Sequence, residues 1–529
     1  MQGQFEVSAI DLTILVGYLV LSRVLALWLT RGGSKDTDGF FLGGRNFIWP
    51  MIGFSLFATN MSGGSFVGLA GAGYSSGIAV YSYEWMAAVI LVFFILFVLP
   101  FYLKAKIFTM PEFLERRYDR RSRYFFAAIL LILGIFLDCA GTLYAGGLVV
   151  QTLFPDWPLW WGVAGLALLA AVLSVTGGLG AVVVSDTIQA VVLFLGGLLV
   201  FFAALAAIPS WDAVRAAAPP DALSIIQPIG SDNLPWPGLI FGVLPIGMYF
   251  WMTNQLIVQR ALGAKSLDHG RWGSLFAGFL KLPILFIMVL PGVMAIPLYP
   301  DLATPDLAFS TLAFDLLPIG IRGIVLAALV AAITSTVDSV LNSSSTLMTM
   351  DLVRPMRPGI SDKALVLIGR LTTVVVTIIA VIWAPNIINF PSLWSYFQSI
   401  LAYLTPPVLV IFLAAVFWSR ANGTGAFVTL VIGVAVGIIG FLTNEVAGAI
   451  DIHFLYANGI LNVFCAVVLV VASLLTAPPD AETAREMTWN PRLWTEETQR
   501  LKTVPLWKNY RVISVVLLLT TAVIVYIYR

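Results

Sequence analysis

Apolar runs of about 20 residues recur along the whole chain, and each is long enough to cross a hydrocarbon core of roughly 30 Å as a helix. Of the 529 residues, 59% are hydrophobic and only 11% are charged, unlike the composition of soluble globular proteins. About fourteen runs can be counted. They cover approximately 9–30, 48–77, 79–103, 124–152, 158–176, 180–208, 236–260, 272–299, 314–350, 364–385, 391–418, 423–443, 452–476 and 510–528. The sequence therefore predicts an all-α polytopic membrane protein.

Basic residues cluster in alternate loops between these runs. The clusters lie at 31–45, 104–123, 260–271, 354–363 and 485–511, and the intervening loops hold almost none. By the positive-inside rule the basic loops are cytoplasmic, which places both chain termini outside. We expect an integral plasma membrane protein, with the bacterial inner membrane as its location. The first run has no Lys or Arg before it and no small-residue cleavage site after it, so we expect it to be retained.

Charge and loop length argue against several classes of function. The chain carries 29 Lys and Arg against 28 Asp and Glu, without a polybasic or acidic tail, so no nucleic-acid partner is expected. The longest extramembrane pieces, about 209–235 and 477–509, are too short for a catalytic domain. We therefore expect that the protein is not an enzyme and that its function resides within the bilayer.

Two of the apolar runs contain helix-breaking residues at membrane depth. The second run holds FATNMSGGSFVGLAGAGYSSG at 57–77, and the seventh holds FGVLPIGMYFWMTNQ, with Pro245 and Gly247. Freed backbone within a membrane is tolerated only where it faces protein or a water-filled cavity. A pair of interrupted helices five spans apart indicates an inverted-repeat transporter with its substrate site between the breaks. Close packing of small residues is the alternative, but Asn60 needs polar partners that packing does not supply.

This pattern divides the chain into five parts. Residues 1–47 would form an extra N-terminal transmembrane helix and a cytoplasmic loop, 48–208 a first repeat of helices 2 to 6, 209–235 an external loop, 236–418 a second repeat of helices 7 to 11, and 419–529 extra C-terminal helices with a cytoplasmic segment at about 477–509. The expected core is a five-plus-five inverted repeat with two broken helices.

Ionisable side chains inside membrane spans are energetically costly, and each is a candidate functional residue. The main ones are Glu84, Asp138, Asp186, Lys281 and Asp338. If Glu84 and Lys281 face one cavity, their charges cancel, which suits a neutral ligand rich in hydroxyl groups. A purely structural salt bridge between helices is the alternative.

Other polar and aromatic side chains could complete a site for a polyol. Gln398 adds an amide in the eleventh run, and Trp251 adds an aromatic face beside the second break. Amides, a carboxylate and an ammonium can hydrogen-bond a polyol from several sides while a ring stacks on its apolar face. The ninth run contains AAITSTVDSVLNSSSTLMTMD, which is dense in hydroxyls. Such oxygens, together with carbonyls freed at an unwound helix, suit a hard cation.

These stretches resemble the sodium/glucose cotransporter branch of the sodium:solute symporter family. The matching pieces, in family order from helix 2 to helix 11, are ATNMSGGSFVGLAGAGY, YEWMAA, VVVSDTIQAVV, YFWMTNQLIVQRALGAKS, AAITSTVDSVLNSSSTLMTMD and YFQSILAYLTPPVLVIFLAAVFW. The resemblance implies a LeuT-like fold and a symporter that imports a neutral sugar by alternating access. It also implies Na⁺ as the coupling ion and no organic cofactor.

The resemblance assigns expected roles to individual residues. For the sugar they are Asn60, Ser65, Glu84, Trp251, Lys281 and Gln398, and for the gates Leu69, Tyr83, Phe250 and Trp394. The main sodium site would use carbonyls of Ala58, Met61 and Ala332 with hydroxyls of Ser335 and Thr336, and a second cation site would use Asp186, Ser335, Asp338 and Ser339. Ser65 and Phe250 lack hydrogen-bonding groups usual at their positions, so the favoured sugar can differ from glucose or galactose.

Other functions remain open on the sequence. Because one fold carries many solutes, the substrate could instead be an amino acid, inositol or a vitamin. The protein could also sense sodium and sugar without transporting them. A proton-pumping respiratory subunit would need a chain of intramembrane ionisable residues, whereas His269 and His453 lie near the ends of apolar runs. We expect the protein to work as a monomer in the lipid bilayer.

Overall fold

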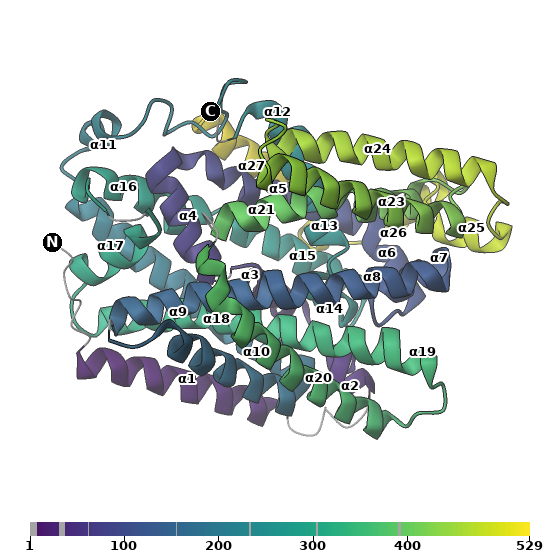
Figure 1. The fold of residues 1–529 in the computed structure, drawn as a ribbon, viewed down its shortest axis with the longest axis horizontal. Helices are drawn as coiled ribbons and strands as arrows, with labels where there is room; N and C mark the ends of the chain where they lie inside the picture. Colours follow the sequence, from purple (N-terminus) through teal and green to yellow (C-terminus); the bar gives the residue numbers. More distant parts are fainter. Residues whose placement is uncertain are drawn as a thin grey trace.

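The computed structural model describes residues 8–30, 37–61, 63–154, 156–231, 234–302, 305–389 and 393–529. These residues are almost entirely helical, which confirms the all-α prediction. Their only β-type pairings are two isolated bridges, Phe47 with Ala264 and Gln227 with Pro235. Most of the long helices run roughly parallel to one axis, which is horizontal in Figure 1.

The helices of the first half of the chain are α1 (Ala9–Leu29), α2 (Thr37–Leu42), α3 (Trp49–Asn60), α4 (Gly63–Ser76), α5 (Ser82–Phe93), α6 (Leu99–Ala105), α7 (Met110–Arg117), α8 (Arg120–Ile132), α9 (Ala140–Leu153), α10 (Leu159–Ala207) and α11 (Trp211–Ala217). Those of the second half are α12 (Trp236–Gly238), α13 (Leu244–Met252), α14 (Gln255–Leu262), α15 (Leu267–Lys281), α16 (Leu290–Leu298), α17 (Ala308–Leu316), α18 (Ile321–Thr346), α19 (Arg354–Met356), α20 (Asp362–Trp383), α21 (Leu393–Leu404), α22 (Pro406–Phe417), α23 (Gly423–Phe441), α24 (Phe454–Leu475), α25 (Ala481–Met487), α26 (Pro491–Leu501) and α27 (Tyr510–Ile527).

The described residues contain ten helices that are long and apolar enough to cross a membrane, or up to twelve if each of two bent helix pairs is one span. A shorter apolar helical stretch covers Leu159–Val172. The multi-pass architecture is therefore confirmed, while the count of about fourteen spans and the division into repeats remain predictions.

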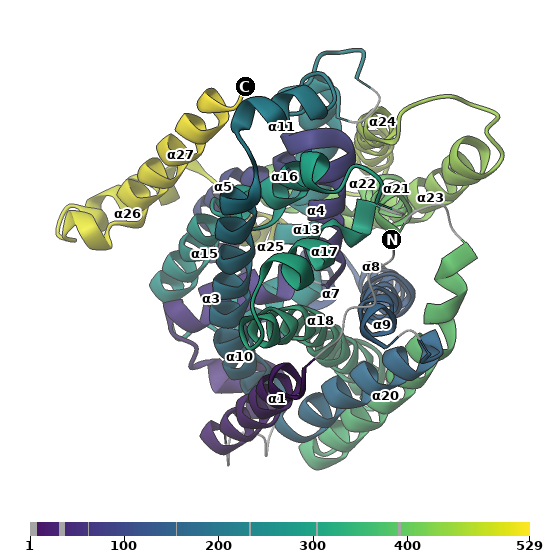
Figure 2. The same cartoon turned by 90° about the vertical axis from the view of Figure 1, so that its left-hand side faces the viewer.

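Helix α18 lies in the centre of the bundle and α1 at its edge, as the view along the helices shows (Figure 2). In the apolar window of the α18 span 94% of residues are buried, against 17% in α1. The hydroxyl-rich sequence of α18 is thus turned towards other helices rather than lipid, which is where polar groups are tolerated in a membrane. Its main neighbour is α10, and α1 packs against both.

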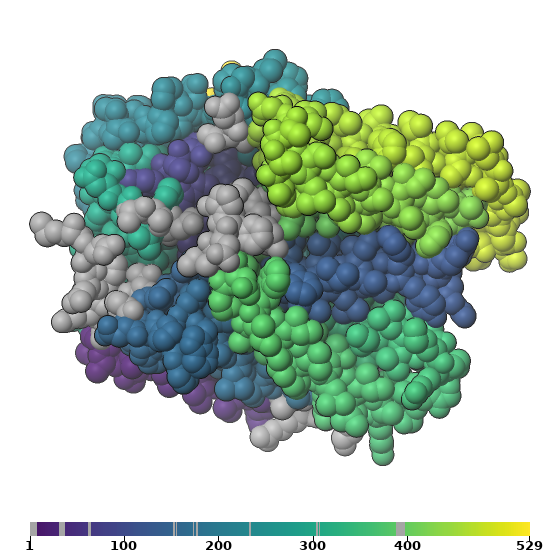
Figure 3. Space-filling model, in the orientation of Figure 1, coloured from purple at the N-terminus to yellow at the C-terminus, as the bar shows by residue number. Residues whose placement is uncertain are grey.

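The outer helices carry exposed apolar side chains on their free faces. Examples are Val24 on α1, Leu371 on α20, Val463 on α24 and Leu519 on α27, each more than half exposed. Figure 3 shows the face on which α8 lies below the α23–α24 pair. Apolar surface of this extent is expected to contact lipid.

The two ends of the helical bundle carry different segments of the chain. The start of α1 and the end of α27 lie towards the left of Figure 1, while α7, α25 and α26 lie towards the right. Arg116 and Arg117 of α7 belong to the basic loops that the sequence predicts to be cytoplasmic. The arrangement is compatible with both termini on the outer side, which remains a prediction.

A kink at Gly178 divides α10 into the two spans predicted at 158–176 and 180–208. Gly178 has φ +60°, and a Cβ at this position would lie 2.6 Å from the carbonyl oxygen of Phe40. Both the backbone angle and the close approach require glycine. The second half of α10 then runs alongside α18 and carries Asp186 to it.

Candidate functional site

The first predicted break is present. Helix α3 ends at Asn60, Met61 has non-helical angles (φ −81°, ψ 74°), and α4 begins at Gly63. A helix that ends inside the bundle leaves its last carbonyls without the N–H groups four residues further on. The Phe57 carbonyl still accepts the N–H of Met61, so the carbonyls that this end can offer to hydroxyls or cations are those from Ala58 to Asn60.

The second break is also present, but it lies after the predicted place. The interruption was expected at Pro245 and Gly247, yet α13 continues through both to Met252. The chain bends by 47° between Met252 and Gln255 instead. Pro245 lies directly after a π-helical turn in a helix that runs from Trp236 to Met252, and the wider hydrogen bonding of that turn accommodates its missing N–H. Gly247 lies close to α5, since a Cβ there would lie 2.5 Å from Ile90 Cδ1.

Side-chain capping produces this second break. The Asn254 side chain accepts a hydrogen bond from the backbone N–H of Leu256 at 3.0 Å and so begins α14. Thr253 at the end of α13 donates its hydroxyl proton to the Tyr249 carbonyl at 2.7 Å. Asn and Thr compete with backbone hydrogen bonding in this way, and together they end one helix and start the next.

A third bend was not anticipated, because 391–418 was expected to be one continuous span. Between Leu404 and Pro406 the chain bends by 49°, at Thr405. The consecutive prolines Pro406 and Pro407 cannot continue the hydrogen bonding of α21. The sequence TPP was the available signal for this bend, which separates Gln398 on α21 from the rest of the span.

Glu84 and Lys281 form a buried ion pair beside the first break. The Lys281 Nζ lies 2.6 Å from Glu84 Oε2, and the Lys281 side chain is fully buried. The same ammonium donates a hydrogen bond to Asn60 Oδ1. The pair thus joins α5 and α15 to the end of α3. Its two charges compensate each other, so the group as a whole is neutral and rich in hydrogen-bonding atoms.

Aromatic rings from both breaks surround this ammonium. The Lys281 Nζ lies 5.4 Å from the ring centroid of Trp251 on α13 and 5.9 Å from that of Phe57 on α3. Trp251 is 3% exposed, and the Phe250 ring meets it edge-on at 5.6 Å. Cation–π contacts of this length stabilise a desolvated ammonium. The two interrupted helices therefore converge on Lys281, as a substrate site between them requires.

Ser65 and Gln398 lie on α4 and α21, two helices that pack together. The Ser65 hydroxyl donates to the Asn60 carbonyl at 3.3 Å. The Gln398 side chain is buried, and among the described residues its Oε1 has no hydrogen-bond partner. A buried amide oxygen without a partner costs free energy, which a ligand hydroxyl could recover by donating to it.

The predicted gate residues are only partly placed. Leu69 of α4 is fully buried, and Tyr83 of α5 packs at the junction of the two main hydrophobic clusters. Phe250 of α13 packs at the edge of one of them. The side chain of Trp394 lies outside the described residues. The gate therefore remains a prediction.

Helix α18 presents its hydroxyls to the end of α3, where the main sodium site was expected. Thr336 donates its hydroxyl proton to the Thr59 carbonyl at 3.0 Å, and Ser335 donates to Asp186 Oδ1 at 2.8 Å. The residues expected to supply carbonyls, Ala58, Met61 and Ala332, are fully buried. No cluster of three or more His, Cys, Asp or Glu is placed to hold a metal within the described ranges. These neutral oxygens fit Na⁺, a hard cation.

Two arginines to which the sequence assigned no role pair with the predicted acidic residues. The Arg260 Nη2 lies 3.7 Å from Asp186 Oδ2 and donates a hydrogen bond to the Ser339 hydroxyl. The Arg23 Nη1 lies 2.7 Å from Asp338 Oδ2. Arg260 was expected in a cytoplasmic loop, and Arg23 lies inside the first apolar run. An arginine within an apolar run was the signal for an intramembrane partner.

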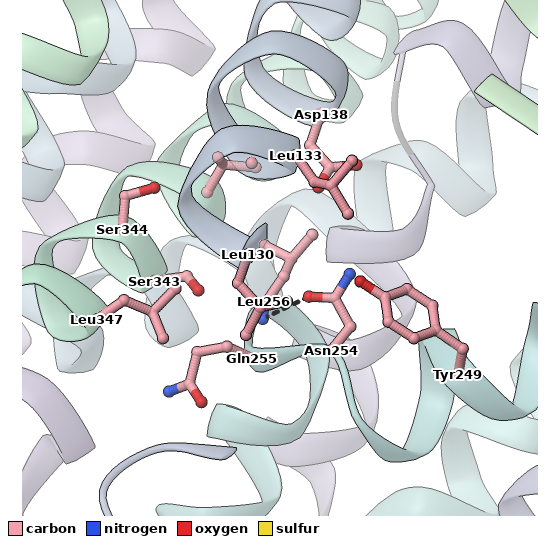
Figure 4. Close-up of a pocket in the computed structure, with 12 residues that line it drawn as sticks. Leu130, Leu133, Asp138, Tyr249, Asn254, Gln255, Leu256, Ser343, Ser344 and Leu347 are labelled. Atoms are coloured by element: carbon pink, nitrogen blue, oxygen red, sulfur yellow. Dashed lines mark hydrogen bonds between the residues drawn. The ribbon is translucent and has the colours of Figure 1, made fainter. Parts of the chain in front are cut away.

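A small cavity of about 10 Å³ lies beside the second break, where residues of α13 and of η4 (Leu133–Cys139) both line it. Figure 4 shows Asp138, Tyr249 and Asn254 around it. The remaining lining residues are Leu130, Leu133, Gly134, Gln255, Leu256, Val340, Ser343, Ser344 and Leu347. A polar space of this size can hold about one water molecule. Asp138, to which the sequence assigned no role, thus borders the broken helix.

Comparisons with known proteins agree with this geometry. The model of the sodium:solute symporter family matches residues 40–433. Sodium/glucose cotransporter 4 of Danio rerio is 32% identical over 94% of this chain and 84% of its own length. Sodium/myo-inositol cotransporter 2 of Bos taurus is 34% identical over 91% of this chain and 79% of its own length.

Solved structures show the same fold at lower sequence identity. A Na⁺-coupled sialic acid symporter in a substrate-bound outward-open state has a TM-score of 0.79 at 23% identity, over 90% of this chain and 99% of its own. A nucleobase-cation-symport-1 family transporter has a TM-score of 0.54 at 13% identity, over 87% of this chain and 99% of its own. These likenesses confirm the predicted LeuT-like fold.

Proposed function

The chain belongs to the sodium:solute symporter family, and we propose that it imports a neutral sugar or cyclic polyol together with sodium by alternating access. It is a multi-pass membrane protein of a family whose coupling ion is sodium. The proposal concerns the solute, the residues that hold it and the way in which the ion drives it.

The observation that carries the proposal is the compensated pair of Glu84 and Lys281 with Asn60 hydrogen-bonded to it. A bound anion would leave one negative charge in excess in a buried place, and a bound cation one positive charge, either of which is costly. A neutral solute rich in hydroxyls instead exchanges hydrogen bonds with the carboxylate, the ammonium and the amide. Trp251 supplies an apolar face on which a sugar ring can stack.

The relatives support the same class of solute. Those reported above are a sodium/glucose and a sodium/myo-inositol cotransporter, and both named solutes are neutral polyhydroxy compounds. The site proposed for this chain consists of Asn60, Ser65, Glu84, Trp251, Lys281 and Gln398, with Leu69, Tyr83, Phe250 and Trp394 as gates. Ser65 is short, so the choice among hexoses and inositols would depend on the space beside it.

Sodium is proposed to act at the first break. An ion held by the Ala58, Met61 and Ala332 carbonyls and by the Ser335 and Thr336 hydroxyls would bridge α3 and α18. Such bridging favours one arrangement of the broken helix and with it the affinity of the adjoining solute site, and the coupling is reciprocal. One positive charge crossing the membrane adds about 2.3 kcal/mol per 100 mV of driving force.

The location and assembly belong to the same proposal. The protein would lie in a plasma membrane, with a bacterial inner membrane as the expected case, and both termini outside. It would function as a monomer, because the solute and ion groups all come from one chain.

Uptake into proteoliposomes tests the proposal. The purified protein is reconstituted and given a panel of radiolabelled hexoses, pentoses, inositols, a neutral amino acid and an anionic sugar acid, each with an inward sodium or potassium gradient. We expect accumulation of a neutral sugar or inositol that needs sodium. Preferred uptake of the amino acid or the sugar acid would overturn the solute class, and sodium-dependent binding without accumulation would identify a sensor.

A further inference from the structure

The acidic cluster between α10 and α18 contains its own cations. Asp186 and Asp338 are fully buried, and each lies within ion-pair distance of a guanidinium, Arg260 at 3.7 Å and Arg23 at 2.7 Å. Arg260 is fully buried, and the Arg23 side chain is 11% exposed. Two negative and two positive charges therefore balance. Further hydrogen bonds to Asp186 come from Ser55 at 2.6 Å and Ser335 at 2.8 Å.

Arg23 reaches this cluster from α1, which is the N-terminal helix outside the two predicted repeats. Its Nη1 donates to Asp338 Oδ2 and also to the Ser185 hydroxyl at 2.9 Å. Helix α1 packs directly against both α10 and α18, so the Arg23 side chain reaches residues of both helices without passing another helix. The charge of Arg23 is thereby placed beside the hydroxyl-rich segment of α18.

The geometry of the Arg23–Asp338 contact differs from that of a usual structural salt bridge. Arginine and carboxylate commonly meet through two parallel hydrogen bonds, whereas here one nitrogen serves both Asp338 and Ser185. Among the described residues, Arg23 Nε and Nη2 and Asp338 Oδ1 are buried without partners. The Arg23 Nη1 therefore contacts one carboxylate oxygen and one hydroxyl oxygen, the same kinds of oxygen that bind a hard cation.

We propose that Arg23 acts as a cation tethered to α1 and takes the place of a second sodium beside Asp338, so that one sodium accompanies each solute. The stoichiometry rests on the proposed symport function. A second Na⁺ beside Asp338 would add another uncompensated positive charge, next to that of the ion at the main site and close to two guanidinium groups. Removing the Arg23 charge would leave one negative charge in excess, which a sodium ion can neutralise.

Equilibrium binding of radioactive sodium to the purified protein in nanodiscs tests this inference. We expect one sodium per wild-type chain and two per chain of the Arg23→Gln variant, with the second removed again in Arg23→Gln combined with Asp338→Asn. Arg23→Lys keeps the charge and should bind one. Arg500→Gln removes an arginine from a cytoplasmic ion pair with Asp268 and is the matched control, also with one sodium.

Accumulation in proteoliposomes gives an independent readout. At zero membrane potential and a tenfold sodium gradient, a one-sodium carrier holds a solute gradient of about tenfold and a two-sodium carrier about a hundredfold. Wild type should reach the lower value and Arg23→Gln should exceed it.

The outcomes separate the two proposals. Two sodium ions on the wild-type chain, or a folded Arg23→Gln protein that still binds one, would overturn the tethered cation while leaving symport intact. Absence of any sodium binding would overturn both. If Arg23→Gln does not fold, the wild-type count alone decides, because one ion agrees with the inference and two do not.

Discussion

The ammonium of Lys281 lies 2.6 Å from a carboxylate oxygen of Glu84, although 197 positions separate the two residues in the chain. One residue ends α15 and the other lies in the first turn of α5. They meet beside Asn60, where α3 ends, and beside Trp251, one residue before α13 ends. The ion pair, whose two charges compensate each other, therefore lies at the point where two helices are interrupted.

Replacing Glu84 with Gln should destabilise the protein and abolish solute binding. The Lys281 ammonium would remain buried without its counter-charge, which costs about 3–5 kcal/mol. Adding Lys281→Met removes the orphan charge and should restore the thermal unfolding temperature but not solute binding. Thermal unfolding and solute binding of both variants provide the measurement. If the double variant binds solute as wild type does, the pair is structural only.

Replacing Gln398 with Glu should weaken solute affinity about tenfold, because the carboxylate keeps an acceptor oxygen but loses the N–H donors of the amide and brings a negative charge into a buried place. Sodium affinity should change little. The matched control is Gln499→Glu on the exposed face of α26, which introduces the same charge away from the proposed site. An unchanged solute affinity of Gln398→Glu would remove this residue from the proposed site.

Replacing Ser335 and Thr336 together with Ala should abolish sodium dependence of uptake. Both hydroxyls lie at the end of α3, and Thr336 bonds the Thr59 carbonyl there at 3.0 Å. Thr521→Ala is the control, since its hydroxyl bonds only within the peripheral helix α27. Uptake is measured as a function of sodium concentration. Retained dependence on the sodium gradient in the double variant would mean that the main cation site lies elsewhere.

Replacing Gly292 with Ala should lower stability by about 1–3 kcal/mol or more, because overpacking is strained where backbone meets backbone. A Cβ on Gly292 of α16 would lie 1.9 Å from the Ala70 carbonyl oxygen of α4. Gly165→Ala in α10 is the control, because nothing lies within 4 Å of the place that its added methyl group would take. Thermal unfolding compares the two. Equal unfolding temperatures would contradict the close contact of α16 with α4.

Replacing Asn254 with Ala should lower the transport rate as well as stability. Loss of a helix cap costs about 1 kcal/mol, and here the cap also sets the bend between α13 and α14. Asn490→Ala removes the same kind of cap from α26, which lies away from both breaks. Both variants should lose comparable stability, while only Asn254→Ala should slow uptake. Equal uptake rates in the two variants would show that the Asn254 cap is not needed for transport.

Much of the architecture followed from local sequence. Apolar runs predict membrane helices because the length and polarity of a span are properties of the segment itself. The break at Asn60 was found because SGG after an amide weakens any membrane helix. The second break was placed too early because a π-helical turn accommodates Pro245 within a continuous helix, whereas Asn254 caps the next helix.

The sequence by itself determined that the chain crosses a membrane many times, that two spans are interrupted and that Glu84, Asp186, Lys281 and Asp338 lie within apolar runs. Only the tertiary structure decided their partners: Lys281 with Glu84, Arg260 with Asp186, and Arg23 with Asp338 across 315 positions. Whether a segment forms a membrane helix depends mainly on its own residues, so the sequence of that segment is enough to predict it. Charge pairing depends on which helix faces pack together, and a buried charge takes whichever partner that packing brings within a few ångströms.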